Sequence, residues 1–243
     1  MFSFLKKKGK RARHYCTALV AAAGSSNRMG GVNKLLQPLD GVPVLARTLT
    51  ALQMAERVDE IIIATREEDL VEISHLCHTY GIKKCKKVIR GGETRGHSVL
   101  QAAYEAAPET TLLAVQDGAR PLVTADLIDD CIRAAERCGA AAPAVAVKDT
   151  IKTVNGEEAV TGTPDRSALR AVQTPQVFDA DLLKAALQSA LEHEVPITDD
   201  CSAVERLGKT VFLIPGSEEN LKITTPVDLV IAEAILRERE EWT

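Results

Sequence analysis

The segment from Thr17 to Lys34 joins an apolar run to a loop of small residues and two cations. Residues 18–23 are apolar, Gly24 opens the loop, and Arg28 stands within it, ahead of Lys34. Small residues after a buried strand let backbone N–H groups approach a phosphate, and nearby cations neutralise its charge. The spacing fits neither G-x-G-x-x-G nor G-x-x-x-x-G-K-[ST]. On this segment alone, phosphate binding and a turn needed only for packing are equally supported.

Two later segments place polar groups where strands are expected to end. Gly91 to Ser98 (GGETRGHS) is a second glycine turn before a predicted helix, whose free N–H groups could hold a carbonyl, a ribose or a phosphate. Gln116 to Pro121 (QDGARP) follows another apolar run, where an acid suits a metal ion or a sugar hydroxyl. Asp117 could equally cap a turn, and Arg120 could simply pair with it.

The cations and glycine loops favour chemistry on phosphates. Arg166 and Lys222 are further cations in polar segments, although a lone lysine such as Lys222 usually faces solvent. The serine-nucleophile motif G-x-S-x-G and the zinc-protease motif H-E-x-x-H are both absent from the sequence. An enzyme that positions phosphates and neutralises charge lets its substrate supply the attacking oxygen. The residues therefore predict nucleotidyl transfer, but they do not identify the substrates.

The elements that must position these residues alternate along the chain. Apolar runs predict strands at 17–23, 60–64, 87–89, 112–115, 142–147 and 211–214. Helical patterns lie at 44–55, 67–80, 95–107, 125–138, 180–191, 199–207 and 226–240. This order predicts an α/β fold with a Rossmann-like, mostly parallel sheet covered by helices on both faces. Such sheets bind ligands at the carboxyl ends of their strands.

Several helix ends carry their own signals. Thr124 and Thr198 are expected to cap the helices that follow them, and Gly139 and Gly208 are expected to end those helices. Pro226 suits the first position of the last helix.

The segment from Asp149 to Thr163 interrupts the alternation. Its residues are β-prone, and Asn155-Gly156 is a hairpin turn signal. An arm with little core of its own usually needs a partner to lie on, which predicts a homodimer formed through an arm at about residues 148–172. The chain has no internal repeat and no long linker, so residues 16–243 are expected to form a single domain.

Composition and charge exclude several classes of protein. Hydrophobic residues make up 45% and aromatic residues 3% of the 243 residues, which suits an aliphatic α/β core. The first fifteen residues carry six cations and no acid and are expected to form a mobile tail. Without those six charges the formal −4 becomes −10 for residues 16–243, so a general nucleic-acid binder is not expected.

The sequence also predicts the cellular location of the protein. No apolar stretch approaches the ~18 residues of a membrane span, and the basic N-terminus lacks the apolar region of a secretory signal. The six cysteines form no C-x-x-C pair, and the group His75, Cys77, His78 and Cys85 matches no standard zinc spacing. We therefore expect a cytoplasmic protein with reduced thiols and no membrane partner.

Taken in order, eight segments resemble the 2-C-methyl-D-erythritol 4-phosphate cytidylyltransferase family. They are AAGSSNRMG, NKLLQPLDGVPVLARTL, GGETRGHSV, QDGARP, AVKDTIK, QTPQVF, ITDDCSAVE and NLKITTPVDLVIAEAIL. The resemblance covers about residues 16–240, and the ordered set is specific where each motif alone is not. The chain departs from the usual pattern at Ser26, Asn27 and Gln116, and the basic tail has no counterpart in the family.

The resemblance implies a fold of the nucleotide-diphospho-sugar transferase type and a defined reaction. CTP and 2-C-methyl-D-erythritol 4-phosphate would give 4-diphosphocytidyl-2-C-methyl-D-erythritol and pyrophosphate, in non-mevalonate isoprenoid biosynthesis. The sugar's phosphate would attack the α-phosphorus of CTP in line. Mg²⁺, bound mainly through CTP, would shield the triphosphate.

The resemblance also implies roles for individual residues. Arg28 and Lys34 match transition-state cations, and Arg166 and Lys222 match the pair that positions the substrate. The implied nucleotide-binding residues are Ala22, Ala23, Gly24, Ser25, Gly92, Glu93, Ser98 and Asp117. The implied substrate-binding residues are Asp117, Arg120, Thr150, Arg166, Thr174 and Lys222. Asp117 is also the implied metal ligand, while Thr150 and Arg166 would reach into the neighbouring subunit's site.

Three alternatives remain on the sequence alone. An alditol-phosphate cytidylyltransferase, such as a ribitol 5-phosphate enzyme, would share the nucleotide half of the site. A catalytically silent nucleotide-binding protein should have lost one or more of the four cations, and none is missing. A nicotinamide dehydrogenase is disfavoured because the dinucleotide fingerprint is absent.

Overall fold

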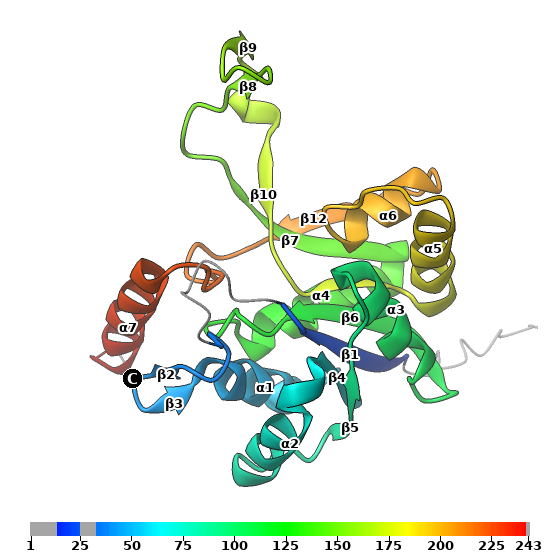
Figure 1. Ribbon diagram of the computed structural model, residues 1–243, viewed down its shortest axis with the longest axis vertical. Helices are drawn as coiled ribbons and strands as arrows, with labels where there is room; N and C mark the ends of the chain where they lie inside the picture. Colours follow the sequence, from blue (N-terminus) through cyan, green and yellow to red (C-terminus); the bar gives the residue numbers. More distant parts are fainter. Residues whose placement is uncertain (1–13, 25–32, 242–243) are drawn as a thin grey trace, which may run out of the picture.

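A central sheet of eight strands organises the protein. The computed structural model describes residues 14–24 and 33–241. The strands are β1 (Tyr15–Ala22), β4 (Glu60–Thr65), β5 (Cys85–Arg90), β6 (Thr110–Asp117), β7 (Ala140–Ala146), β10 (Arg170–Val172), β11 (Gln176–Asp179) and β12 (Phe212–Pro215). Their order is β10-β7-β11-β6-β1-β4-β5, with β12 paired to β7 (Figure 1).

Four neighbouring strands form the main parallel part of the sheet. Strands β6, β1, β4 and β5 pair in parallel, as does β12 with β7. The prediction of an α/β fold with a mostly parallel sheet is confirmed. Two short strands were not predicted: β11 lies antiparallel between β6 and β7, and β10 lies antiparallel to β7. With three or four residues each, they are too short to show an apolar period.

The described residues form seven α-helices, and all seven were predicted. They are α1 (Val44–Met54), α2 (Leu70–Thr79), α3 (Arg95–Tyr104), α4 (Ala125–Cys138), α5 (Ala180–Glu192), α6 (Asp200–Arg206) and α7 (Pro226–Glu241). The α2 helix starts later than predicted because residues 67–69 form a 3₁₀ turn, η2 (Glu67–Asp69). Among the described residues, no helix is both long and apolar enough to cross a membrane.

Alternation along the buried strands divides the core into two layers. Val20 and Ile63 face the layer built on α1, α2 and α4, whereas Leu19 and Ile62 face the layer built on α3, α5 and α6. All four side chains are at most 1% exposed. Because successive side chains of a strand point to opposite faces, one continuous apolar run serves both layers.

The helix ends confirm four of the five predicted signals and correct one. Pro226 is the first residue of α7, as predicted. Thr124 accepts a hydrogen bond from the N–H of Leu127, and Gly139 and Gly208 adopt φ angles of 80° and 72° just past α4 and α6. The prediction that Thr198 caps the α6 helix is wrong. Asp199 is the cap, because its carboxylate accepts from the N–H of Ser202 at 2.9 Å and the Ser202 hydroxyl accepts from the N–H of Asp199 at 3.3 Å.

Two small hairpins lie outside the main sheet. One joins β2 (Pro38–Leu39) to β3 (Val42–Pro43), and the other joins β8 (Thr153–Val154) to β9 (Val160–Gly162). The second hairpin projects beyond the sheet (Figure 1), together with the 3₁₀ turn η3 (Arg166–Ala168). Its loop is closed by the Asn155 side chain, whose oxygen accepts from the N–H groups of Glu157 and Ala159 at 3.0 Å each. The turn signal is confirmed.

Phe178 anchors the α3/α5 layer, and replacing it should destabilise the fold. Its side chain is fully buried on β11. We expect Phe178→Ala to lower the free energy of unfolding by about 3–5 kcal/mol, because it removes buried apolar surface and leaves a cavity. Urea denaturation measures the change. Phe212→Ala, at a side chain 52% exposed on β12, is the matched control, and equal losses in both variants would contradict the burial argument.

Candidate functional site

A cavity of about 340 Å³ lies at the carboxyl ends of β1 and β6, beside the start of α3. This is the edge where a parallel sheet is expected to bind ligands. The residues that line it are Ala21, Ala22, Ala23, Gly24, Lys34, Leu35, Gly92, Glu93, Thr94, Arg95, Ser98, Asp117, Ala119 and Lys222. Residues from five parts of the sequence therefore meet around one space.

One wall consists of backbone turns that approach each other closely. A Cβ atom on Gly91 would lie 2.8 Å from the Cβ of Ala23 and 2.7 Å from the Ser98 hydroxyl oxygen, so only glycine fits there. The Ser98 hydroxyl accepts a hydrogen bond from the N–H of Gly92 at 3.1 Å and donates to the carbonyl of Thr94 at 3.0 Å. Ser98 thereby holds the glycine turn against the first turn of α3.

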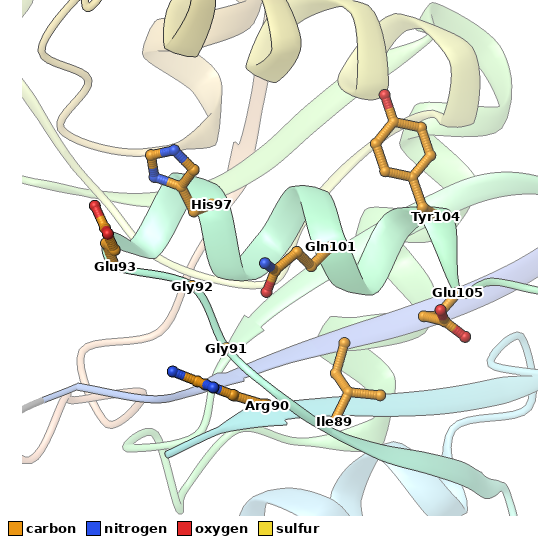
Figure 2. A pocket seen from close by; sticks show the side chains of 9 residues that line it. All are labelled: Ile89, Arg90, Gly91, Gly92, Glu93, His97, Gln101, Tyr104 and Glu105. Atoms are coloured by element: carbon orange, nitrogen blue, oxygen red, sulfur yellow. The ribbon is translucent and has the colours of Figure 1, made fainter. Parts of the chain in front are cut away.

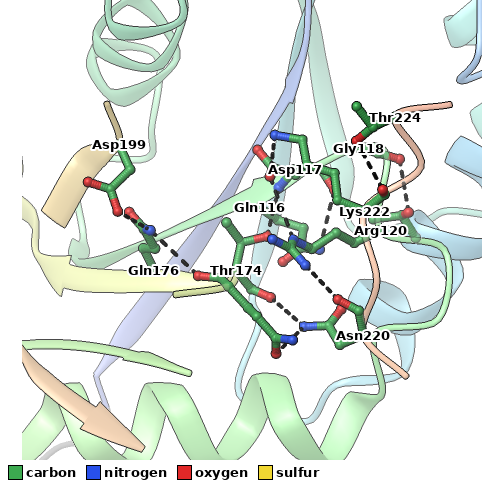
Figure 3. A network of polar contacts seen from close by, with 12 residues as sticks. Gln116, Asp117, Gly118, Arg120, Thr174, Gln176, Asp199, Asn220, Lys222 and Thr224 are labelled. Atoms are coloured by element: carbon green, nitrogen blue, oxygen red, sulfur yellow. Dashed lines mark hydrogen bonds and ion pairs between the residues drawn. The ribbon is translucent and has the colours of Figure 1, made fainter. Parts of the chain in front are cut away.

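Asp117 also lines the cavity, at the end of β6, and is surrounded by cations. Its carboxylate is 2.9 Å from the Lys222 ammonium and 3.6 Å from the guanidinium groups of both Arg95 and Arg120. Its backbone N–H donates to the Thr174 hydroxyl at 3.1 Å. Figure 3 shows Lys222 and Arg120 converging on Asp117 from different segments. The cluster carries more positive than negative charge beside the cavity.

The cations keep Asp117 ionised. Burial alone would favour its neutral form, but the ion pairs with Lys222, Arg95 and Arg120 outweigh burial and lower the pKa of the Asp117 carboxyl below its usual value. The carboxylate is therefore charged at neutral pH and is available to orient cations.

Arg95 also forms a second ion pair. Arg95, the first residue of α3, places a guanidinium nitrogen 2.7 Å from the Asp200 carboxylate, which is fully buried at the start of α6. Burial raises the pKa of Asp200 even though Arg95 lies beside it. Sequence reasoning assigned no role to Arg95 or Asp200. The available signal was a cation three residues after Gly92, at a predicted helix start, and two consecutive acids at another predicted helix start.

The structure brings most of the predicted site residues together. Ala22, Ala23, Gly24, Gly92, Glu93, Ser98, Asp117, Lys34 and Lys222 all line the cavity. Arg120 and Thr174 lie behind Asp117: Arg120 donates to the carbonyl of Asn220 at 2.5 Å, and Thr174 accepts from Asp117. The predicted Arg28 and Ser25 lie outside the described residues.

Two predicted residues are not part of this cavity. Thr150 and Arg166 are exposed on the projecting arm, and the Arg166 guanidinium donates to the carbonyl of Lys148 at the base of that arm. Neither is among the residues that line the chain's own cavity. Any contact of these residues with a substrate must therefore come from a different site or a different arrangement.

The carboxylates that line the cavity indicate what kind of metal ion it could bind. Within the part of the chain that the structure describes, no three His, Cys, Asp or Glu side chains gather in a way that could hold a metal ion. Asp117 and Glu93 are the carboxylates among the lining residues. Mg²⁺ usually keeps several waters and binds one or two carboxylates together with substrate phosphates. The donor set fits a Mg²⁺ ion that arrives with a nucleotide better than it fits an all-protein metal centre.

A larger groove of about 890 Å³ adjoins the cavity across Gly92 and Glu93. Figure 2 shows His97, Gln101 and Tyr104 along α3 and Ile89 and Arg90 at the end of β5, all of which line the groove. Its one arginine, Arg90, is paired with Glu67 at 3.2 Å. The groove therefore lacks the cluster of cations that makes the smaller cavity suitable for phosphates.

The family-model match and two similar relatives all point to one family. Residues 16–238 match the family described as 2-C-methyl-D-erythritol 4-phosphate cytidylyltransferase. A relative of that name from Bacillus cytotoxicus is 45% identical over 221 residues, which cover 90% of this chain and 97% of the relative. Another of that name, from Halalkalibacterium halodurans, is 43% identical over 92% of this chain and 98% of its own length.

Solved structures show the same likeness. The crystal structure of 4-diphosphocytidyl-2C-methyl-D-erythritol synthase from Anaerococcus prevotii superposes with a TM-score of 0.83 at 30% identity, covering 92% of this chain and 96% of that one. The 2-C-methyl-D-erythritol 4-phosphate cytidylyltransferase from Thermus thermophilus gives a TM-score of 0.74 at 32% identity, covering 92% and 99% of the two chains.

Proposed function

Because the chain belongs to the 2-C-methyl-D-erythritol 4-phosphate cytidylyltransferase family, we propose how the residues of its cavity carry out that family's reaction. The protein is a cytidylyltransferase of isoprenoid precursor biosynthesis that uses CTP and 2-C-methyl-D-erythritol 4-phosphate. The proposal rests above all on the meeting of Lys34, Lys222 and Asp117 with two backbone turns around one cavity.

We assign the nucleotide to the wall made of the two turns. Residues 22–24 and Gly92 present backbone groups without bulky side chains, and such groups can approach a base or a phosphate closely. Glu93 and the N-terminus of α3 add polar groups beside them. Lys34 lines the same cavity and would neutralise the negative charge that builds up on the α-phosphate and the departing pyrophosphate.

We assign the sugar phosphate to the wall around Asp117 and Lys222. One oxygen of its phosphate attacks the α-phosphorus of CTP in line, and the bond to the bridging oxygen of the pyrophosphate breaks. Lys222, with a side chain 42% exposed, can contact both Asp117 and an entering phosphate. The protein supplies position and positive charge, while the attacking oxygen belongs to the substrate.

Magnesium is proposed as the metal of the reaction. When bound, Mg²⁺ shields the charge of the triphosphate. Asp117 is the carboxylate best placed to contact a metal carried in by CTP, because it is ionised and lies on the cavity wall. Arg95 and Arg120 would hold this carboxylate in position while a cation binds on its open side.

A homodimer formed through the arm is also part of the proposal. Nearly every residue from 148 to 172 is exposed, and the arm carries four large exposed apolar side chains: Ile151, Val154, Val160 and Val172. Exposed apolar side chains on a hairpin without a core of its own favour a protein partner. In such a dimer, Thr150 and Arg166 would complete the partner's site, which explains their distance from the chain's own cavity.

The dimer proposal predicts complementation between two inactive variants. Lys34→Ala removes a cation that lines the cavity of its own chain, and Arg166→Ala removes a cation from the arm. If Arg166 serves the partner, a mixed dimer has one intact site, and random mixing should restore about a quarter of parental activity. Co-expressed and separately purified variants provide the comparison. Mixtures no more active than the separate variants would show that Arg166 does not act across the dimer.

We propose the cytoplasm as the compartment. All six cysteines are free thiols and four of them are buried, as is usual for proteins of a reducing compartment.

The activity is tested by a panel of sugar-alcohol phosphates with CTP, followed by release of pyrophosphate. We expect turnover with 2-C-methyl-D-erythritol 4-phosphate and little with ribitol 5-phosphate, the alternative that the comparisons do not favour. Preference for ribitol 5-phosphate would overturn the substrate assignment, and CTP binding without pyrophosphate release on any member of the panel would overturn the activity.

A further inference from the structure

We propose that Arg95, anchored by the buried carboxylate of Asp200, is a positioning residue that keeps Asp117 in place when Lys222 moves to the phosphate of the substrate. The inference rests on the proposed function, because it concerns the same site. It extends the role of Arg95 and assigns a role to Asp200, which the reaction scheme above does not use.

The buried Asp200 carboxylate forms an ion pair with Arg95. Its carboxylate is 0% exposed, and the guanidinium nitrogen of Arg95 lies 2.7 Å away. A carboxylate removed from water is strongly destabilised unless a cation compensates for the lost hydration. Asp199 and Asp117 are also close enough to act on this carboxylate, and both oppose its ionisation. Arg95 therefore provides the compensating charge and is held in turn.

The position of Asp200 is fixed by the neighbouring strand. The buried side chain of Gln176 on β11 accepts hydrogen bonds from the N–H groups of Asp200 and Cys201, both at 3.1 Å. The same side chain donates to the Asp199 carboxylate at 2.8 Å. The first turn of α6 is thus fastened to the sheet, and Arg95 is anchored to a rigid element.

The other side of Arg95 faces Asp117. The Nε of Arg95 lies 3.6 Å from one carboxylate oxygen, and Arg120 and Lys222 approach the other oxygen at 3.6 and 2.9 Å. Arg120 is anchored as well, because its guanidinium donates to the carbonyl of Asn220 at 2.5 Å and its side chain is only 10% exposed. Lys222, at 42%, is the most exposed of the three cations.

The difference in exposure between Lys222 and the two anchored arginines defines the role of Arg95 and Asp200. When Lys222 turns to a phosphate, Asp117 loses its closest counterion, and the anchored guanidinium groups of Arg95 and Arg120 keep the carboxylate in place. Without Arg95, Asp117 would hold Lys222 more tightly, and the carboxylate would compete with the phosphate for the same ammonium group. Loss of Arg95 should therefore weaken the binding of the sugar phosphate more than that of CTP.

The test uses the double variant Arg95→Gln/Asp200→Asn in the full chain. Removing both charges avoids leaving a buried unpaired carboxylate, so the variant should fold with a Tm close to that of the parent. We expect the KM for 2-C-methyl-D-erythritol 4-phosphate to rise about tenfold, a usual cost of losing an outer partner of a site residue, while the KM for CTP changes far less. Arg95→Lys, which keeps the charge, should recover part of the loss.

Arg57→Gln is the matched control. Arg57 has the same side-chain exposure as Arg95, 30%, and pairs with Glu136 at 2.7 Å, but it precedes β4 at the opposite end of the strands from the site. Its kinetic constants should equal those of the parent. A parental KM for the sugar phosphate in the double variant, or an equal rise in the KM for CTP, would overturn the positioning role. If the parent protein itself shows no activity with CTP and the sugar phosphate, the proposed function is overturned, and not only the positioning role.

Discussion

Replacing Lys34 with alanine is expected to lower kcat by a few hundredfold or more while the affinity for CTP falls far less. Lys34 lines the cavity beside the turn of residues 22–24, where the triphosphate is proposed to bind. Negative charge increases on the α-phosphate and on the pyrophosphate as the transition state forms. Removing one preorganised cation from a transition state commonly costs ~3–4 kcal/mol. Steady-state kinetics with both substrates varied measures the two effects separately.

Lys209→Ala is the control for loss of a positive charge. Lys209 is exposed in the turn that follows α6 and does not line the cavity, so its removal should leave both constants unchanged. Near-normal turnover by Lys34→Ala would contradict the proposed role of Lys34. A loss confined to the KM for CTP would show that Lys34 binds the ground state and the transition state equally. The same prediction holds for Arg28, which lies outside the described residues.

Replacing Asp117 with asparagine is expected to lower kcat at least a hundredfold without weakening CTP binding. The substitution keeps the shape of the side chain but removes the negative charge at the centre of Arg95, Arg120 and Lys222. Three cations without a carboxylate repel one another and lose their orientation, and losing one preorganised group of a reaction site costs ~10²–10³ in rate. The added positive charge should hold the triphosphate at least as tightly as before.

Equilibrium binding of CTP and single-turnover kinetics separate these two effects. Asp130→Asn is the matched control, because Asp130 pairs with Arg133 on the exposed surface of α4, where an ion pair contributes little. Turnover of Asp117→Asn within a few-fold of the parent would refute the central role of this carboxylate. A large drop in CTP affinity would assign Asp117 mainly to nucleotide binding.

Much of the fold was predictable because its signals are local. The apolar runs of β1 and β4 sit next to turn residues, and α4 carries both its cap, Thr124, and its terminating glycine, Gly139. Such signals depend on neighbours a few residues apart, and tertiary contacts do not change them. The prediction of Thr198 as the cap of α6 failed by one residue, because Asp199 forms a reciprocal pair with Ser202 that no single-residue preference reveals.

The chemistry of the site was also predictable in kind. Glycine turns after strands, with Lys34, Asp117 and Lys222 nearby, indicated phosphate chemistry at the carboxyl edge of a parallel sheet. The sheet places the ends of β1 and β6 side by side, and the cavity forms between them. This outcome follows from the rule that parallel strands end at one edge, whatever the length of chain between them.

The sequence by itself determined the regular elements, the two glycine turns and the types of residue at the site. Only the tertiary structure decided which charges meet. The pairing of Arg95 with Asp117 and Asp200 requires α3, β6 and α6 to meet in space. The start of α6 is held there by Gln176 of β11, a strand too short to predict that inserts antiparallel beside β6. The physical reason is that propensity and periodicity act over a few residues, whereas an ion pair between distant segments exists only once the order of the strands is set.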